Sequence, residues 1–264
     1  MQAMTVPLEE RAPALSVEQL GVRYGALVAL DGVTWSVRPG EVLGIIGPNG
    51  AGKSSCYDAV TAMVKRQGRV VLQGHDVTQV PPYRLAELGL KRAFQQNAFF
   101  DDLSVLDNLV AVLGRRSHSS LLGSVFSPLA ATRLRGKAST FAAAQLVRFG
   151  VPAAYHDLSP KEIPYGVQRM LSIALAYGHG AHVLMLDEPA AGLGGDDMVR
   201  LVELLGSLKS EGVALVVIEH HMDLIMAVAD RICVLDLGRQ LAYDVPAKIQ
   251  HDPRVLEAYL GKPQ

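Results

Sequence analysis

The sequence predicts an α/β fold with a mostly parallel core sheet, and three observations lead to it. Short apolar runs recur along the chain, as buried parallel strands require. Segments with the spacing of helices follow most of these runs. A glycine-rich loop, residues 47–54, joins the first run to a helix. Such alternation of strands and helices is typical of sheets covered by helices on both faces. The apolar runs are Val42–Ile46, Val183–Leu186, Val213–Ile218 and Arg231–Leu235.

The composition fits one α/β domain with a small second lobe. The chain has 264 residues, of which 49% are hydrophobic and 19% are charged. Its formal net charge of −1 provides no basic surface for nucleic acid, which is therefore not an expected partner. Cys56 and Cys233 lack metal-ligand spacing and are expected to be reduced and buried, as in a cytosolic protein. No uncharged apolar run approaches the ~18 residues that a membrane span needs.

The first third of the chain predicts a loose tail followed by strands. Residues 1–14 combine charges with prolines and have no apolar core, so we expect a flexible tail and not a signal peptide. Apolar and polar residues alternate in Val17–Tyr24 and Val33–Val37, as in strands with one exposed face. Gly68–Leu72 predicts another strand, and the two prolines that follow begin a short helix that ends near Leu88.

A helical lobe is expected from about residue 99 to residue 178. Its apolar residues recur at helical spacing between residues 105 and 113. Residues 115–139 are basic and rich in serine, and they predict an inserted, partly mobile segment without a chemical role. The α/β pattern then resumes, and residues 246–264 form a C-terminal helical extension. The helices predicted after the lobe are Asp196–Ser210, Met222–Ala229 and Ala247–Leu260.

Residues 47–54 fit the phosphate-loop pattern G-x-x-x-x-G-K-[ST]. The strand Val42–Ile46 before the loop and the helix Ser54–Met63 after it supply the context that the motif needs, which argues against a chance glycine-rich turn. The glycines let successive backbone N–H groups point at a polyanion. Lys53 can reach the β- and γ-phosphates, and Ser54 can ligate Mg²⁺. A nucleoside triphosphate is therefore expected to bind at Gly47, Pro48, Asn49, Gly50, Ala51, Gly52, Lys53, Ser54 and Ser55.

Two acidic residues, Asp187 and Glu188, directly follow the apolar run Val183–Leu186. The carboxyl end of a parallel strand is where a doubly wound sheet exposes its reactive groups. Asp187 is expected to hold Mg²⁺, and Glu188 to orient or deprotonate the water that attacks the γ-phosphate. Alone, such a pair is often only a solvated strand end, but the phosphate loop upstream favours the catalytic interpretation.

A histidine pair, His220 and His221, follows the run Val213–Ile218 and the intervening Glu219. A histidine at such a strand end can hydrogen-bond a γ-phosphate and respond to its loss. Without the other motifs it would more often be a surface residue. The remaining histidines match no ligand spacing and are assigned no role.

With these motifs in order, residues 15–262 resemble the nucleotide-binding subunits of ABC transporters. The resemblance implies a phosphate-loop NTPase with an antiparallel β subdomain, an α-helical signature subdomain, and ATP and Mg²⁺ as cofactors. It matches Tyr24 to the aromatic residue that stacks on adenine, and His220 to the switch histidine. Gln95 matches the glutamine that contacts Mg²⁺ and the attacking water and that links to the membrane subunit, with Gln96 as the adjacent alternative.

The signature motif of that family, Leu-Ser-Gly-Gly-Gln, corresponds to the segment that begins at Ile163. In the family, the helix that begins here binds the γ-phosphate of ATP on the other subunit. The resemblance therefore implies that Pro164, Tyr165 and Gly166 take part in nucleotide binding in trans.

The chain departs from this motif in ways that bear on the contact in trans. Pro164 replaces the serine whose hydroxyl binds phosphate, so the expected donors are backbone N–H groups and the helix dipole. Gly194 stands where the family often has an aspartate. Upstream, Ser159 and Glu162 predict a capping box and not the signature itself.

Within the family, the chain is similar to importer ATPases for branched-chain amino acids and to related ones for amides and urea. The likeness rests on residues 164–169, 188–193, 219–224 and 252–261. Those importers carry two different ATPase subunits, and residues 115–139 match the insertion of the longer one. The implied partners are a second ATPase subunit, either identical or a shorter paralogue, transmembrane permease subunits and, indirectly, a solute-binding protein. The implied location is peripheral, on the cytoplasmic face of the plasma membrane.

Other functions compete with this one. A different ABC ATPase, such as a lipid or lipopolysaccharide exporter subunit, remains an alternative. Only the likeness of the insertion and of the C-terminal stretch to the importer ATPases argues against it. A soluble ABC ATPase that acts on DNA or ribosomes would commonly need tandem cassettes, long coiled coils or basic arms. The altered signature is also compatible with a regulatory subunit that only binds ATP. A kinase is disfavoured because no acceptor-site motif accompanies the two acidic residues.

Overall fold

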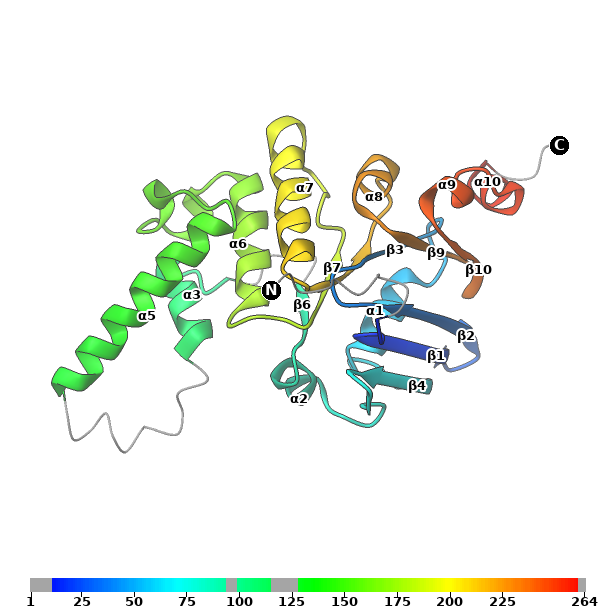
Figure 1. Cartoon of the computed structure of the whole chain (residues 1–264), viewed down its shortest axis with the longest axis horizontal. Helices are drawn as coiled ribbons and strands as arrows, with labels where there is room; N and C mark the ends of the chain where they lie inside the picture. Colours follow the sequence, from blue (N-terminus) through cyan, green and yellow to red (C-terminus); the bar gives the residue numbers. More distant parts are fainter. Residues whose placement is uncertain (1–10, 94–98, 115–127, 261–264) are drawn as a thin grey trace, which may run out of the picture. The chain divides into compact units, whose positions relative to one another are not determined.

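The computed structural model describes residues 11–93, 99–114 and 128–260, which form two units (Figure 1). The first unit comprises the described residues of Met1–Gln95, Ala181–Ala191 and Leu205–Gln264. The second comprises those of Gln96–Gly180 and Gly192–Leu204. Three predictions fall outside the described residues: most of the N-terminal tail, the pair Gln95 and Gln96, and residues 115–127 of the inserted segment.

A six-stranded sheet in the first unit has the strand order β10-β9-β3-β8-β7-β6. Neighbouring strands from β9 to β6 run parallel, and only β10 pairs antiparallel, with β9. The inner strands are almost entirely apolar because both of their faces are covered. The predicted α/β fold with a mostly parallel core sheet is thereby confirmed. The strands are β3 (Val42–Ile46), β6 (Leu90–Ala93), β7 (Val183–Asp187), β8 (Ala214–Ile218), β9 (Arg231–Asp236) and β10 (Arg239–Asp244).

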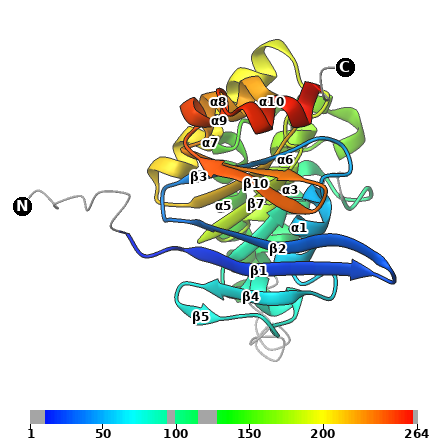
Figure 2. The same ribbon diagram turned by 90° about the vertical axis from the view of Figure 1, so that its right-hand side faces the viewer.

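A second, four-stranded sheet is antiparallel and has the order β2-β1-β4-β5, in agreement with the expected β subdomain (Figure 2). Its strands are β1 (Leu15–Tyr24), β2 (Leu27–Val37), β4 (Gln67–Leu72) and β5 (His75–Asp76). Strand β2 begins well before the predicted Val33, because Leu27 and Val28 continue the ladder opposite Tyr24 and Arg23. These residues are exposed, and the alternation of apolar and polar residues did not reveal them.

The core of the first unit draws side chains from both sheets and from α1 (Lys53–Val60). Trp35 and Tyr57 are its largest buried aromatic residues. The other helices that lie wholly in this unit are α2 (Pro82–Glu87), α8 (Met222–Val228), α9 (Pro246–Ile249) and α10 (Pro253–Leu260). Helix α7 (Gly195–Ser210) contributes residues to both units.

The second unit is built on α3 (Val105–Gly114), α5 (Pro128–Arg148) and α6 (Tyr165–Tyr177). Short 3₁₀ turns at Ala153–Tyr155 and Pro160–Glu162 connect α5 to α6. Residues 128–139 of the predicted insertion are helical and form the first part of α5. Proline is favourable at a helix start because its φ is already helical and its missing N–H would have no partner there. No helix of the described chain is both long and apolar enough to cross a membrane.

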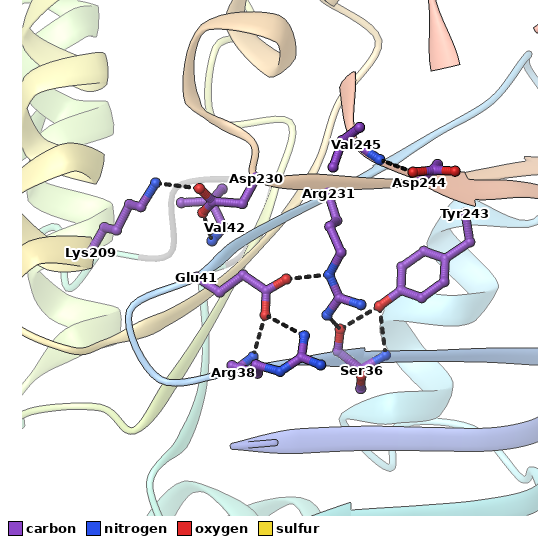
Figure 3. A network of polar contacts seen from close by, with 10 residues as sticks. All are labelled: Ser36, Arg38, Glu41, Val42, Lys209, Asp230, Arg231, Tyr243, Asp244 and Val245. Atoms are coloured by element: carbon purple, nitrogen blue, oxygen red, sulfur yellow. Dashed lines mark hydrogen bonds and ion pairs between the residues drawn. The ribbon is translucent and has the colours of Figure 1, made fainter. Parts of the chain in front are cut away.

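A buried carboxylate joins the two sheets of the first unit (Figure 3). Glu41, which is 2% exposed, accepts a hydrogen bond of 2.7 Å from the backbone N–H of Arg38 and another from the guanidinium of Arg231. Arg231 also donates to the carbonyl oxygen of Ser36 at 2.8 Å and lies 4.8 Å from the ring centroid of Tyr243. These contacts connect β2 with β9 and β10.

Replacing Glu41 by alanine is expected to lower the free energy of unfolding by about 3 kcal/mol, because a partly buried guanidinium loses its counter-charge. Asp31→Ala is the matched control. It removes a carboxylate that also pairs with an arginine, Arg239, at 2.9 Å, but both side chains are at least half exposed. The control should cost less than about 1 kcal/mol. Equal losses of stability in chemical denaturation would contradict a special role for the buried pair.

Candidate active site

The phosphate loop connects β3 to α1, and its shape excludes side chains at two glycines. Gly47 has a φ of 153°, and a Cβ there would lie 2.1 Å from the carbonyl oxygen of Leu235. Gly52 has a φ of 101°, and a Cβ would lie 2.7 Å from the carbonyl oxygen of Ala29. Gly52 is also the N-cap of α1, and no side chain caps this helix start. The amide donors of the first turn can therefore be offered to an anion.

Lys53, the lysine of the phosphate loop, is buried. Its ammonium donates hydrogen bonds to the carbonyl oxygens of Gly47 at 2.7 Å and Pro48 at 3.0 Å. Burial lowers the pKa of Lys53, while the charges of Glu188 and Asp187 oppose this shift. The amine is thus held by loop carbonyls near two acidic side chains. Next to it Ser54 is exposed and Ser55 is partly buried, while Asn49 and Gly50 are exposed on the loop.

The acidic pair lies at the same edge of the core sheet. Strand β8 pairs with β3 on one side and with β7 on the other, and Asp187 lies opposite Ile218. Burial raises the pKa of Asp187 to about 6, and the charge of Glu188 adds to this effect. Glu188 has a φ of 47°, a conformation uncommon for residues other than glycine. Its backbone N–H donates to the carbonyl oxygen of Ile218 at 2.8 Å. Such strain, concentrated beside a phosphate loop, is typical of a functional site.

Because the pKa of Asp187 is raised in the folded protein, folding stability should fall as pH rises from about 4 through about 6. At neutral pH, Asp187→Asn should therefore stabilise the nucleotide-free protein by about 2 kcal/mol. Near pH 4 the gain should be small, since the carboxyl is then largely protonated. Thermal unfolding at both pH values measures the difference, with the exposed Asp102→Asn as the control. A gain that does not depend on pH would contradict this explanation.

His220 lies next to Glu188, and half of its side chain is exposed to solvent. Its Nδ1 is 3.5 Å from a carboxylate oxygen of Glu188, and its side chain is 50% exposed. The ring centroid of His221 is 4.1 Å from that of His220. The structure thus brings the phosphate loop, both predicted acidic residues and the predicted histidine to one edge of the sheet.

Glu219 is a functional candidate that the sequence reasoning missed. It is fully buried, and it accepts a hydrogen bond from the N–H of Ala190 at 2.7 Å. It also accepts from the N–H groups of His220 at 3.0 Å and His221 at 3.2 Å. One carboxylate therefore fixes the loop after Glu188 together with the segment that carries the histidines. The available signal was a charged residue at the end of an apolar run.

Tyr57 and Arg92 hold the strand end that precedes Gln95. The hydroxyl of Tyr57 donates toward the carbonyl oxygens of Ala93 and, at 3.1 Å, of Met185. The guanidinium of Arg92 lies 4.5 Å from the Tyr57 ring centroid and pairs with Asp58 at 3.1 Å. Gln95 itself lies outside the described residues.

Two further aromatic residues bear on the site. Tyr24, at the end of β1, is 47% exposed, as a residue that stacks on a base must be. Tyr259 of α10 was not expected here. Burial raises the pKa of Tyr259, and a hydrogen bond with the backbone of Gly47 opposes the rise. The C-terminal extension thus reaches the first glycine of the phosphate loop.

The signature segment belongs to the second unit, and its helix α6 begins at Tyr165. Pro164 is the N-cap of α6 without a side-chain cap, and the first helical residue, Tyr165, is 46% exposed. A Cβ on Gly166 would lie 2.1 Å from a carboxylate oxygen of Asp197, so a larger residue there would have to displace this side chain. The predicted capping box of Ser159 and Glu162 is confirmed.

Comparison with known proteins establishes the family. Residues 30–191, more than half of the chain, match the model of the family described as ABC transporter. The chain belongs to this family. Residues 239–263 also match the model described as branched-chain amino acid ATP-binding cassette transporter. The predicted family, the fold class and the prediction of a transporter ATPase are confirmed by this membership.

Similar proteins cover nearly the whole chain. The chain is 34% identical over 252 residues to the high-affinity branched-chain amino acid transport ATP-binding protein BraF of Pseudomonas aeruginosa. This alignment covers 95% of the chain and 98% of BraF. The chain is 33% identical, with the same coverage, to LivG of Escherichia coli K12, which has the same description. A nucleotide-free ATP-binding cassette from an ABC transporter superposes with a TM-score of 0.79 at 28% identity, over 95% of this chain and 100% of the other. The ADP conformation of such a cassette gives 0.79 at 27% identity, with the same coverage.

Proposed function

We propose that this ABC subunit hydrolyses ATP to energise the import of branched-chain amino acids or of related small solutes such as amides and urea. The observation that carries the proposal is the match of residues 239–263 to the branched-chain amino acid cassette model. It is supported by relatives that carry this transport in their names and align over 98% of their length.

The proposed ATP site uses the residues gathered at the carboxyl edge of the core sheet. The backbone N–H groups of residues 47–55, apart from Pro48, and the ammonium of Lys53 bind the β- and γ-phosphates, because they combine directed donors with a positive charge. The exposed aromatic ring of Tyr24 stacks on the adenine.

Ser54 and Asp187 would hold Mg²⁺, together with Gln95. Hydroxyl, carboxylate and amide oxygens are ligands that Mg²⁺ prefers. The raised pKa of Asp187 fits a site that is completed by a cation, because a cation offsets both the burial of the carboxylate and the repulsion from Glu188. When bound, the ion neutralises negative charge on the phosphates.

Glu188 would orient and deprotonate the attacking water, and His220 would hydrogen-bond the γ-phosphate. The 3.5 Å separation between their side chains lets one water-sized reactant meet both groups. Glu219 keeps the two segments in register through its hydrogen bonds with Ala190 and His220.

The functional assembly proposed is a head-to-tail pair of ATPase subunits, in which the partner is a copy of this chain or a shorter paralogue. The helix start at Pro164, Tyr165 and Gly166 would meet the nucleotide of the other subunit, mainly through backbone N–H groups. ATP favours the closed pair because it contacts both halves only in that state. Closure would act on transmembrane permease subunits through the segment around Gln95, and a solute-binding protein would deliver the solute. In the proposed assembly the chain is peripheral to the plasma membrane, on its cytoplasmic face.

Purification of the tagged chain from membranes tests the assembly. Two permease proteins and a shorter ATPase are expected to copurify, and the complex in vesicles should import labelled leucine only with ATP and a solute-binding protein. Testing acetamide and urea in the same vesicles separates the related solutes. ATP-driven movement of a lipid or lipopolysaccharide by the complex, without solute import, would overturn the proposal.

A further inference from the structure

The turn between β9 and β10 is attached to the phosphate loop and to β2 at the same time. The backbone N–H of Gly238 donates to the carbonyl oxygen of Ala51 at 3.1 Å, and its carbonyl oxygen accepts from the N–H of Asp31 at 2.8 Å. A Cβ on Gly52 would lie 3.5 Å from the Cα of Gly238, and a Cβ on Gly238 would lie 2.7 Å from the carbonyl oxygen of Ala29. Three separate segments therefore meet at the loop.

Leu237, immediately before this glycine, is an unusual residue for the two-residue turn that joins β9 to β10. Its φ is 45°, in the left-handed region that disfavours bulky side chains and suits glycine or asparagine. Its apolar side chain is also 84% exposed, the highest exposed fraction among the large hydrophobic residues of the described chain. Asparagine would satisfy the turn better on both grounds, so the leucine needs an explanation outside folding.

Other exposed apolar side chains lie on the hairpin that approaches the loop from β2. Tyr24 is 47% exposed and Leu27 is 64% exposed, and the two residues pair across the β1–β2 hairpin. The same strand β2 continues to Ala29, and a Cβ on either Gly52 or Gly238 would lie 2.7 Å from its carbonyl oxygen. Figure 2 shows β10 running beside β2. The β1–β2 hairpin and the β9–β10 hairpin thus both have exposed apolar side chains, and both contain residues that pack against the phosphate loop.

We infer that Leu237 is part of the nucleobase subsite and forms, with Tyr24, the apolar surface that takes the adenine ring. The inference rests on the proposed function, because the loop must first hold the phosphates of ATP. A flat aromatic base is the ligand component that needs apolar contact, whereas the ribose and the phosphates need polar partners. The attachment of Gly238 to Ala51 keeps Leu237 at a constant place relative to the phosphates.

Leu237→Asn separates base binding from folding, because asparagine accepts the left-handed backbone better than leucine does. The variant is expected to have a Tm about 2 °C above that of the parent. Its affinity for Mg-ATP should be weaker by roughly fivefold to tenfold, as expected for the loss of one apolar contact. Its affinity for inorganic triphosphate with Mg²⁺, which lacks the base, should equal that of the parent. Calorimetry with both ligands measures this difference.

Leu88→Asn is the control, since it makes the same change at a residue that is 49% exposed at the end of α2. It should leave both affinities unchanged. If Leu237→Asn binds ATP as tightly as the parent, or loses ATP and triphosphate equally, the nucleobase contact is refuted while the phosphate site stands. If the parent binds neither ligand, the proposed function fails and this inference fails with it.

Discussion

Replacing Glu188 by glutamine is expected to preserve ATP binding and to lower the rate of hydrolysis by at least about 100-fold, the usual contribution of a general base. Glutamine has nearly the same shape as glutamate, so the left-handed backbone at residue 188, with its φ of 47°, should persist. The amide cannot take a proton from water at neutral pH. In the proposed head-to-tail pair, ATP would still bridge the subunits without being consumed, so the variant should accumulate as a closed dimer.

Glu87→Gln provides the matched control, because Glu87 is an exposed glutamate on α2 that pairs with Arg84 at 2.7 Å. It should hydrolyse ATP at the rate of the parent. Phosphate release measures turnover, and size-exclusion chromatography with ATP measures the dimer. Turnover at the parent rate in Glu188→Gln would show that another group activates the water.

Replacing Lys53 by alanine is expected to weaken the binding of Mg-ATP by about 100-fold, which corresponds to roughly 3 kcal/mol. The ammonium of Lys53 is held at 2.7 Å from the Gly47 carbonyl oxygen, so it is already oriented before the phosphates arrive. Its loss removes a positive charge where burial excludes solvent, and Asp187 and Glu188 then repel the nucleotide without compensation.

Lys65→Ala is the control for net charge, since Lys65 is an exposed lysine shortly after α1. Calorimetric titration should give the parent affinity for this control. Melting temperatures measured without nucleotide show whether either variant has lost its fold. Unchanged ATP affinity in folded Lys53→Ala would refute the site proposed at residues 47–55.

Most of the core sheet could be predicted, because each inner strand is recognisable from its own short stretch of residues. Val42–Ile46 and Ala214–Ile218 are uninterrupted apolar runs, and burial on both faces leaves no place for a polar residue. Elements with exposed faces were predicted less well. The start of β2 at Leu27 depends on pairing with β1, and the helix that begins at Pro128 runs through a segment whose composition resembles a loop.

The sequence by itself determined the chemistry of this protein. A phosphate loop, two acidic residues after an apolar strand and a histidine after the next one are local patterns, because backbone shape and strand position follow from short stretches of residues. Only the tertiary structure decided which residues support that chemistry. Glu219 is a buried acceptor for both Ala190 and His220, and Leu237 stands exposed beside the loop, because chain segments far apart in sequence meet there. Such contacts cannot be recognised from the periodicity of the sequence, because they depend on the order of strands in the sheet and not on neighbouring residues.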